Sequence, residues 1–385
     1  MLISRVFIQF TVLMSLSSSL YSGTFRVNIF SEHSVYTVVI SPGRGIYRLV
    51  TDGEERIVIG ENDVIYVSVA EEMLMLRGRS GFIGSFQNVS FKATEAGSEF
   101  SIRPVDPFME RAYYHGSLEL SVDLGRIRIV NAVDENIYLA GVVEAESGKN
   151  AHDMYYRAQA IICRTYLYGN LSRHEDEGFH LCDGVHCQVY KGILTGDKTV
   201  YAAVIETSGK VITQGDSILI TAAFHSNCGG QTVNSEDVWL VYRPYLRSVY
   251  DPYCSDSRSS SWEIMIDAGK WESYLSAMGL VNKYDPHGTA NFAFTQQDRN
   301  VCYSSNGKVI PFTKIRSDWN FRSAYFDIEP DDRGEKLLVR GRGSGHGVGL
   351  CQEGAMEMAG RGYNFIDILL FYYTDIRISD IDNLL

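Results

Sequence analysis

GVVEAE at residues 141–146, followed by AQAIICRTY at 158–166, places a carboxylate on the apolar side of an expected helix. On a helix, positions i, i+3, i+4 and i+7 share one face, and Glu146 is the fourth member of such a set. The other three members are the apolar residues Leu139, Val142 and Val143. Glu146 therefore points toward the core, where a charge is costly unless it is paired or protonated.

Two interpretations of Glu146 follow from this pattern alone. A buried carboxyl group with a raised pKa is what a general acid at neutral pH needs. The alternative is a structural glutamate that is held by an arginine, either Arg157 or Arg164. Glu144 lies about 200° around the helix from Glu146, on the side that we expect to face solvent.

The surrounding sequence predicts an α+β fold. We expect the helix that carries Glu146 to span 134–146, with Asp134 as its N-cap, and a second helix to span 151–168. Before them, residues 24–133 form short alternating or β-branched runs that Gly or Asp separates, which is typical of antiparallel strands. A β-rich N-terminal part and a mixed helical and strand C-terminal part should together form one cleft. Later elements are expected at 197–207 and 351–361 as helices, and at 210–212, 218–225 and 337–343 as strands.

The domain organisation begins with a targeting segment. Residues 1–22 have the shape of a secretory signal peptide, and an uncleaved N-terminal anchor is the alternative. We therefore expect an exported protein of the periplasm or cell envelope. It would contact a membrane only through this segment, and only if the segment is not cleaved. The rest should comprise a β-rich region at 23–113 and a catalytic domain at 114–375. A subdomain inserted at 255–310 is also expected, with helical character around 262–280.

The composition is that of a folded, acidic protein. Of the 385 residues, 45% are hydrophobic and 12% are aromatic, which argues against a disordered chain. The formal net charge is −12 and no basic block is present to contact phosphates, so we do not expect nucleic acid as a partner. The seven cysteines are an odd number and cannot all pair within one chain.

Four motifs stand in order along the chain. They are YLAGVVEAE (138–146) with AQAIICRTY, HCQVYKG (186–192), AFHSNCGGQT (223–232) and GRGSGHGVGLCQEGA (341–355). In this order and spacing they resemble the SpoIID/LytB family of peptidoglycan-acting proteins, the stage II sporulation protein D type. Each motif is modest alone, but the resemblance covers roughly residues 114–373, most of the chain.

The resemblance implies a lytic transglycosylase, and the family's catalytic glutamate aligns with Glu146. Such an enzyme cleaves the MurNAc–GlcNAc bonds of denuded glycan strands, from which the stem peptides have been removed, and leaves 1,6-anhydro-muramyl ends. Here Ser147 and Gly148 stand where the family often has Met-Pro, which alters the turn after the helix. Because some relatives are non-catalytic enhancers of amidases, the alternative is a peptidoglycan-binding protein that stimulates a cell-wall amidase.

Five further residues are candidate glycan contacts. His346 and Gln352 lie in the glycine-rich fourth motif, and a glutamine can bond hydroxyl or acetamido groups. Arg164 would suit the lactyl carboxylate of a denuded muramyl unit. Gln159 and Ser226 complete the set. The competing interpretation of the two loop motifs is a structural turn that binds no ligand.

The loop HLCDGVHC at 180–187 offers four nitrogen and sulfur ligands for a structural zinc ion: His180, Cys182, His186 and Cys187. His174 is a further candidate ligand. The alternative is a Cys182–Cys187 disulfide that closes a small loop. A hydrolytic zinc site at this loop is a weaker hypothesis, since adjacent thiolates suggest a closed site without an open coordination position.

Overall fold

The computed structural model describes residues 23–193, 198–257, 259–281, 292–305 and 307–384. The signal peptide or anchor expected at 1–22 lies outside these residues, as does part of the expected insertion, at 282–291. Among the described residues, no helix combines the length and the apolar character needed to cross a membrane.

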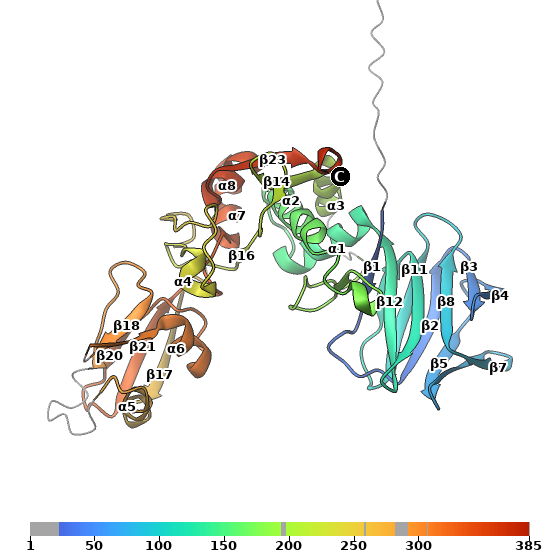
Figure 1. Cartoon of the computed structure of the whole chain (residues 1–385), viewed down its shortest axis with the longest axis horizontal. Coiled ribbons are helices and arrows are strands. Elements are labelled where there is room, and N and C mark those ends of the chain that lie inside the picture. Colours follow the sequence, from blue (N-terminus) through green and yellow to red (C-terminus); the bar gives the residue numbers. More distant parts are fainter. Residues whose placement is uncertain (1–22, 194–197, 258, 282–291, 306, 385) are drawn as a thin grey trace, which may run out of the picture.

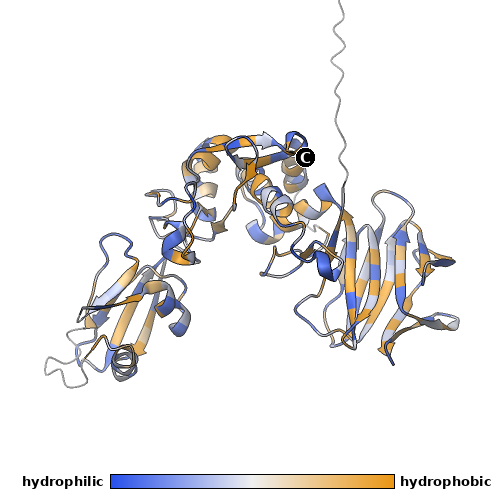
Figure 2. Cartoon of the chain, in the orientation of Figure 1, coloured by the Kyte–Doolittle hydropathy of each residue, from blue (hydrophilic) through white to orange (hydrophobic). Residues whose placement is uncertain are grey.

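The N-terminal region forms two mostly antiparallel sheets that share one core (Figure 1). Inward and outward residues alternate along the strands, as Figure 2 shows for β11 and β12, because successive side chains of a strand point to opposite faces. The seven-stranded sheet has the order β13 (Leu181–Cys182), β1 (Thr24–Asn28), β12 (Arg126–Asp134), β11 (Ser117–Asp123), β8 (Asn88–Ala93), β3 (Tyr47–Thr51), β4 (Glu54–Ile59). The six-stranded sheet has the order β10 (Ala112–His115), β9 (Glu99–Asp106), β2 (Thr37–Arg44), β5 (Ile65–Ala70), β6 (Met73–Gly78), β7 (Gly81–Phe86).

The chain passes directly from β12 into the helical part, so the first helix is attached to the middle of the large sheet. Helix α1 (Glu135–Ser147) packs on α2 (Asp153–Gly169) and on α3 (Lys198–Glu206). The remaining helices and strands of this part are α4 (Ser235–Trp239), α7 (Gln352–Gly360), α8 (Phe365–Tyr372), β14 (Lys210–Gln214), β15 (Ile218–Leu219), β16 (Phe224–His225), β22 (Leu350–Cys351) and β23 (Ile376–Asp380), with short 3-10 turns at Glu175–Glu177 and Ile381–Asn383.

A second hydrophobic core is built from residues between Trp262 and Val339, and its members are separate from those of the main core. It lies at the lower left of Figure 1, and Trp271 is fully buried in it. Its elements are β17 (Ser261–Asp267), α5 (Ala268–Ala277), β18 (Cys302–Ser305), β19 (Lys308–Pro311), α6 (Phe312–Trp319), β20 (Phe326–Pro330) and β21 (Lys336–Arg342).

The mixed α+β fold confirms the predicted fold class. The helical character expected around 262–280 is wrong for its first part, because β17 pairs there with β21 along its whole length. Local composition could not show this, since the partner strand lies about seventy residues further along the chain. The second core also reaches beyond residue 310, where the insertion was expected to end.

Candidate functional site

Two features of helix α1 position Glu146: a capped N-terminus and a buried apolar face. Asp134 caps the helix, since its carboxylate accepts hydrogen bonds from the backbone N–H groups of Asn136 and Ile137. The three apolar residues that share a face with Glu146 are each 0% exposed, so the predicted orientation of the helix is confirmed: Leu139, Val142 and Val143. Glu146 itself lies in the last turn and is half-buried.

Few polar groups act on the Glu146 carboxylate among the described residues. Its Oε1 atom accepts a hydrogen bond of 3.0 Å from the backbone N–H of Val189. Burial raises the pKa of Glu146, and the Val189 hydrogen bond and the charge of Lys191 lower it by less. The backbone carbonyl of Glu146 accepts a bond of 3.1 Å from Nε2 of Gln352, so the fourth motif contacts the first.

The alternative in which an arginine holds Glu146 is wrong. Arg157 pairs with Asp153 at 3.2 Å and also with Glu206. Arg164 is fully buried, and its Nε donates to Oε1 of Glu135 at 2.7 Å. Each arginine is therefore engaged elsewhere, and Glu146 keeps its carboxylate without that partner.

Arg164 also cannot serve as the expected contact for a glycan carboxylate. Beyond Glu135, its guanidinium donates to the backbone carbonyls of Thr207, at 2.7 Å, and Val204, at 3.1 Å. The side chain thus ties α2 to α1 and α3 in the interior, and its exposed fraction is 0%. This placement corrects the expectation, because a buried and fully bonded guanidinium offers nothing to a ligand.

Gln159 is likewise buried in α2. Its Nε2 lies 3.6 Å from Sγ of Cys163, and its Oε1 has no hydrogen-bond partner among the described residues. With an exposed fraction of 0% it does not reach solvent. The expectation of a direct glycan contact at this residue is therefore not supported by its position.

Glu144 differs from its expected place on the solvent side. Its side chain is 13% exposed, and its nearest cation is Lys149, whose Nζ lies 4.0 Å from Oε1. A helical wheel considers one helix alone, so it could not show this burial. Helix α1 therefore carries a second half-buried carboxylate, two residues before Glu146.

The remaining candidates lie where β16 and β22 run side by side. These short strands pair in parallel, which brings the start of the AFHSNCGGQT motif beside the glycine-rich motif. The rings of His225 and Trp239 lie 5.4 Å and 5.2 Å from that of His346. Burial lowers the pKa of His346 to about 4, so its imidazole is neutral at pH 7. Ser226 follows β16 directly and is half-buried.

A cluster of two histidines and two cysteines closes the loop before Val189. The ligand atoms of His174, Cys182, His186 and Cys187 all lie within 4.8 Å of one another. His174 and not His180 therefore supplies the fourth member. The Nδ1 atom of His180 instead accepts a hydrogen bond of 3.1 Å from the backbone of Arg26. The disulfide alternative is not formed, since Cys182 and Cys187 are both free thiols.

Comparison with known proteins fits this arrangement. A family model described as stage II sporulation protein matches residues 123–214. Stage II sporulation protein D of Bacillus subtilis (strain 168) is 30% identical over 282 residues, which cover 66% of this chain and 78% of that protein. This chain belongs to the stage II sporulation protein D family.

Two further proteins are similar to this chain. An uncharacterized protein of Brachyspira hyodysenteriae is 27% identical over 343 residues, which cover 83% of this chain and 85% of that protein. An amidase enhancer of Bacillus subtilis (strain 168) is 27% identical over 292 residues, which cover 63% of this chain and 40% of that protein.

Three residues that take part in the candidate site were not predicted from the sequence. Val189 acts through its backbone N–H, which no side-chain pattern reveals. Lys191 affects the pKa of Glu146 across more than forty residues of sequence. Trp239 stands outside the four motifs, yet its ring lies against that of His346 and the residue is 40% exposed. The HCQVYKG motif, which contains Val189 and Lys191, was the available signal for the first two.

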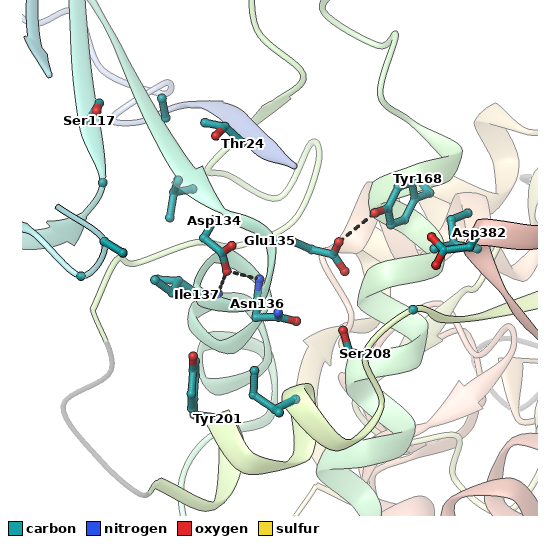
Figure 3. A pocket seen from close by; sticks show the side chains of 18 of the residues that line it. Thr24, Ser117, Asp134, Glu135, Asn136, Ile137, Tyr168, Tyr201, Ser208 and Asp382 are labelled. Atoms are coloured by element: carbon teal, nitrogen blue, oxygen red, sulfur yellow. Dashed lines mark hydrogen bonds between the residues drawn. The ribbon is translucent and has the colours of Figure 1, made fainter. Parts of the chain in front are cut away.

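A large cavity lies at the opposite end of α1 from Glu146. It has a volume of about 1010 Å³, and its lining includes Asp134, Glu135, Tyr168 and Asp382 (Figure 3). The Glu135 carboxylate accepts a hydrogen bond of 2.7 Å from the Tyr168 hydroxyl there. None of the motif residues discussed above as glycan contacts lines this cavity. We therefore place the candidate site at the C-terminal end of α1.

Proposed function

We propose that this chain is an exported peptidoglycan lytic transglycosylase of the periplasm or cell envelope, with Glu146 as its single acid and base. The observation that carries the proposal is the environment of Glu146. Its carboxyl group is half-buried at the end of α1, accepts one backbone hydrogen bond and has a raised pKa. The carbonyl end of a helix disfavours negative charge, which favours the protonated form further.

The proposed reaction needs only this one carboxyl group. Protonated Glu146 donates its proton to the bridging oxygen as the MurNAc–GlcNAc bond breaks, so the departing GlcNAc gains a hydroxyl. The 6-hydroxyl of MurNAc then attacks the anomeric carbon, and its proton passes to the Glu146 carboxylate. The acid is restored, a 1,6-anhydro ring forms and no water is consumed. Most glycoside hydrolases instead require two carboxyl groups.

Three of the predicted contacts remain in this proposal. Gln352 is bonded to the backbone of Glu146, which places the glycine-rich motif beside the acid. His346 and Ser226 lie along the β16–β22 pair that leads to Gln352. A neutral imidazole, an amide and a hydroxyl suit the hydroxyl and acetamido groups of a denuded glycan strand. Trp239 adds an aromatic surface of the kind that packs on sugar rings.

A structural zinc ion fits the cluster in the preceding loop. The ligand set of two imidazoles and two thiols is one that tetrahedral zinc prefers. Cys187 Sγ lies 3.5 Å from Nε2 of His174, whose Nδ1 faces Oε1 of Glu177 at 2.6 Å. Such a carboxylate behind a ligating histidine orients its ring. When bound, the metal would supply a cross-link that fixes the loop whose Val189 bonds Glu146.

The test is mass spectrometry of denuded glycan strands after incubation with the purified protein. We expect products that end in 1,6-anhydro-muramic acid, absent with Glu146→Gln and retained with Glu144→Gln. The second variant is a matched control, because Glu144 is a half-buried carboxylate on the same helix. Reducing-end products that require both glutamates would instead establish hydrolysis by a carboxylate pair.

The likeness to an amidase enhancer favours a second candidate function. In that case the chain binds glycan strands without cleaving them and stimulates a cell-wall amidase. A pull-down with denuded strands and an amidase assay, both run with the parent protein and Glu146→Gln, separate the two. Binding and stimulation that survive Glu146→Gln, with no anhydro product from the parent protein, would support the enhancer and exclude the enzyme.

A further inference from the structure

A second set of metal-ligating side chains lies in the interior, apart from the histidine and cysteine loop. The ligand atoms of Cys228, Asp251, Cys254 and Cys351 all lie within 4.8 Å of one another. Each of these four residues has an exposed fraction of 0%. The Sγ atoms of Cys228 and Cys254 are 3.3 Å apart, and Cys228 Sγ lies 3.2 Å from Oδ2 of Asp251.

Backbone and side-chain donors surround this cluster. Cys351 Sγ accepts hydrogen bonds from the N–H groups of Cys228, at 3.3 Å, and Gly354, at 3.4 Å. The Tyr372 hydroxyl donates to Oδ2 of Asp251 at 2.9 Å, and the N–H of Tyr253 donates to Oδ1 at 2.9 Å. Donors of this kind stabilise anionic ligands and orient them, as in the outer shells of known metal sites.

The backbone is shaped to admit the carboxylate. A Cβ atom at Gly354 would lie 2.4 Å from Oδ2 of Asp251 and in similar conflict with the Tyr372 hydroxyl. Only glycine at this position in α7 lets Asp251 and Tyr372 meet beside Cys351. A buried cysteine alone often behaves as a small apolar residue. Three thiols around a buried carboxylate are not explained in that way, because the carboxylate needs a positive partner.

We propose that Cys228, Asp251, Cys254 and Cys351 bind one zinc ion in a closed, structural site. Zinc–thiolate bonds of about 2.3 Å at tetrahedral angles place neighbouring sulfurs about 3.8 Å apart, close to the spacing seen here. Three thiolates and one carboxylate complete four-coordination. The full burial of all four residues leaves no open position for a substrate water.

The ligands come from the segments that connect the second core to the main one. Cys254 precedes β17, the first strand of the second core, and Cys351 follows β21, the last. Cys228 belongs to the loop after β16. Arg299, within the insertion, donates to the backbone carbonyl of Cys228 at 3.2 Å and so brings a positive charge toward the anionic cluster. An ion here would hold both ends of the insertion against the β16–β22 pair, next to Gln352.

The test compares the zinc content of the purified full-length protein with that of single variants. Cys254→Ser should lose about one equivalent of zinc per chain relative to the parent. Cys302→Ser, a cysteine outside both clusters, is the matched control and should lose none. Unchanged zinc in Cys254→Ser would overturn the proposal, and so would a parent protein without zinc.

Two measurements keep the proposal testable if Cys254→Ser fails to fold. Gly354→Ala keeps every ligand but displaces Asp251, so it should weaken zinc retention during dialysis against a chelator more than Gly360→Ala, which has open space around it. Equal retention in the two variants would count against the site. Alkylation of the denatured parent without reductant should modify Cys228, Cys254 and Cys351 as thiols. A Cys228–Cys254 disulfide would replace the metal with a covalent bond and refute the proposal.

Discussion

The two ends of helix α1 each carry an enclosed glutamate, but the two are held very differently. Glu135 at the start is bonded to the Arg164 guanidinium at 2.7 Å and to the Tyr168 hydroxyl at 2.7 Å. Glu146 at the end accepts one hydrogen bond, from a backbone N–H. Burial raises the pKa of Glu146, so this carboxyl group has an increased tendency to hold a proton.

The partners of each carboxylate are a better guide to the candidate site than the size of the nearby cavity. The cavity of about 1010 Å³ lies at the Glu135 end, where the carboxylate forms an ion pair with Arg164. The Glu146 end has the raised pKa and the contact with the glycine-rich motif. The presence or absence of a bonded cation therefore separates the structural Glu135 from Glu146, the residue that we propose as the acid, on the same helix.

The largest expected effect is that of Glu146→Gln, which tests the proposed role of Glu146 directly. We expect glycan cleavage to fall by about 10²–10⁴-fold, the usual contribution of a general acid or base. Stability should change little, because the amide replaces a carboxylate that has no cation bonded to it. Rates on denuded strands and urea unfolding curves measure the two effects. Retained cleavage would mean that the acid lies elsewhere.

The next effect concerns the other end of the helix. Glu135→Gln leaves the fully buried Arg164 without its charge partner, so the free energy of unfolding should fall by about 3–5 kcal/mol. Cleavage per folded molecule should remain close to that of the parent. Replacing both partners, as Glu135→Gln with Arg164→Met, should recover part of the lost stability. If Glu135→Gln instead lost activity without losing stability, the two ends would have exchanged roles.

A pH series sharpens the same contrast. Because the folded-state pKa of Glu146 is raised above its ordinary value of 4.5, the native state holds this proton more tightly than the unfolded chain. Its contribution to stability is present below pH 4.5 and is lost as the pH rises through the folded-state pKa, by about 1.4 kcal/mol per unit of pKa difference. The stability difference between the parent and Glu146→Gln, measured from pH 4 to 8, should therefore fall with rising pH. A flat difference would show that the pKa is not raised.

The smallest expected effect is that of Lys191→Met. Lys191 lowers the pKa of Glu146 through its charge, and it is solvent-exposed. Exposed pairs contribute about 0.2–1 kcal/mol, so the basic limb of the cleavage profile should move up by roughly 0.2–0.7 pH units. Added salt should shrink the difference between parent and variant. Lys210→Met, at the start of β14, serves as a charge-matched control and should leave the profile unchanged.

Local signals were sufficient for part of this molecule. The α1 boundaries, the Asp134 cap and the inward direction of Glu146 follow from spacing within a few residues, and the structure confirms them. The corrections involve tertiary contacts, some between residues that are distant in sequence. Glu135 and α3 enclose Arg164, which the local sequence around Arg164 could not show. His174 takes the place of His180 in the histidine and cysteine cluster because the loop folds back on itself.

The same reasoning explains why the second cysteine cluster was not foreseen. Its members stand at 228, 251, 254 and 351, so only Asp251 and Cys254 are close in sequence and no second short pair of ligands marks a zinc site. The strand pairing of β16 with β22 brings the outermost two together across 123 residues. Sequence alone indicated only that seven cysteines cannot all pair within one chain, because a contact across such a distance has no local pattern.

The interruption of the main core by the 262–339 insertion has a consequence for how the chain matures. A chain made from its N-terminus presents both large sheets, α1 and α2 early, but β22, α7, α8 and β23 come only after the insertion. Gln352 therefore reaches the backbone of Glu146 among the last contacts to form. In an incomplete chain Glu146 lacks this contact with the glycine-rich motif. Helix α1, which carries Glu146, is therefore synthesised well before α7, which carries Gln352.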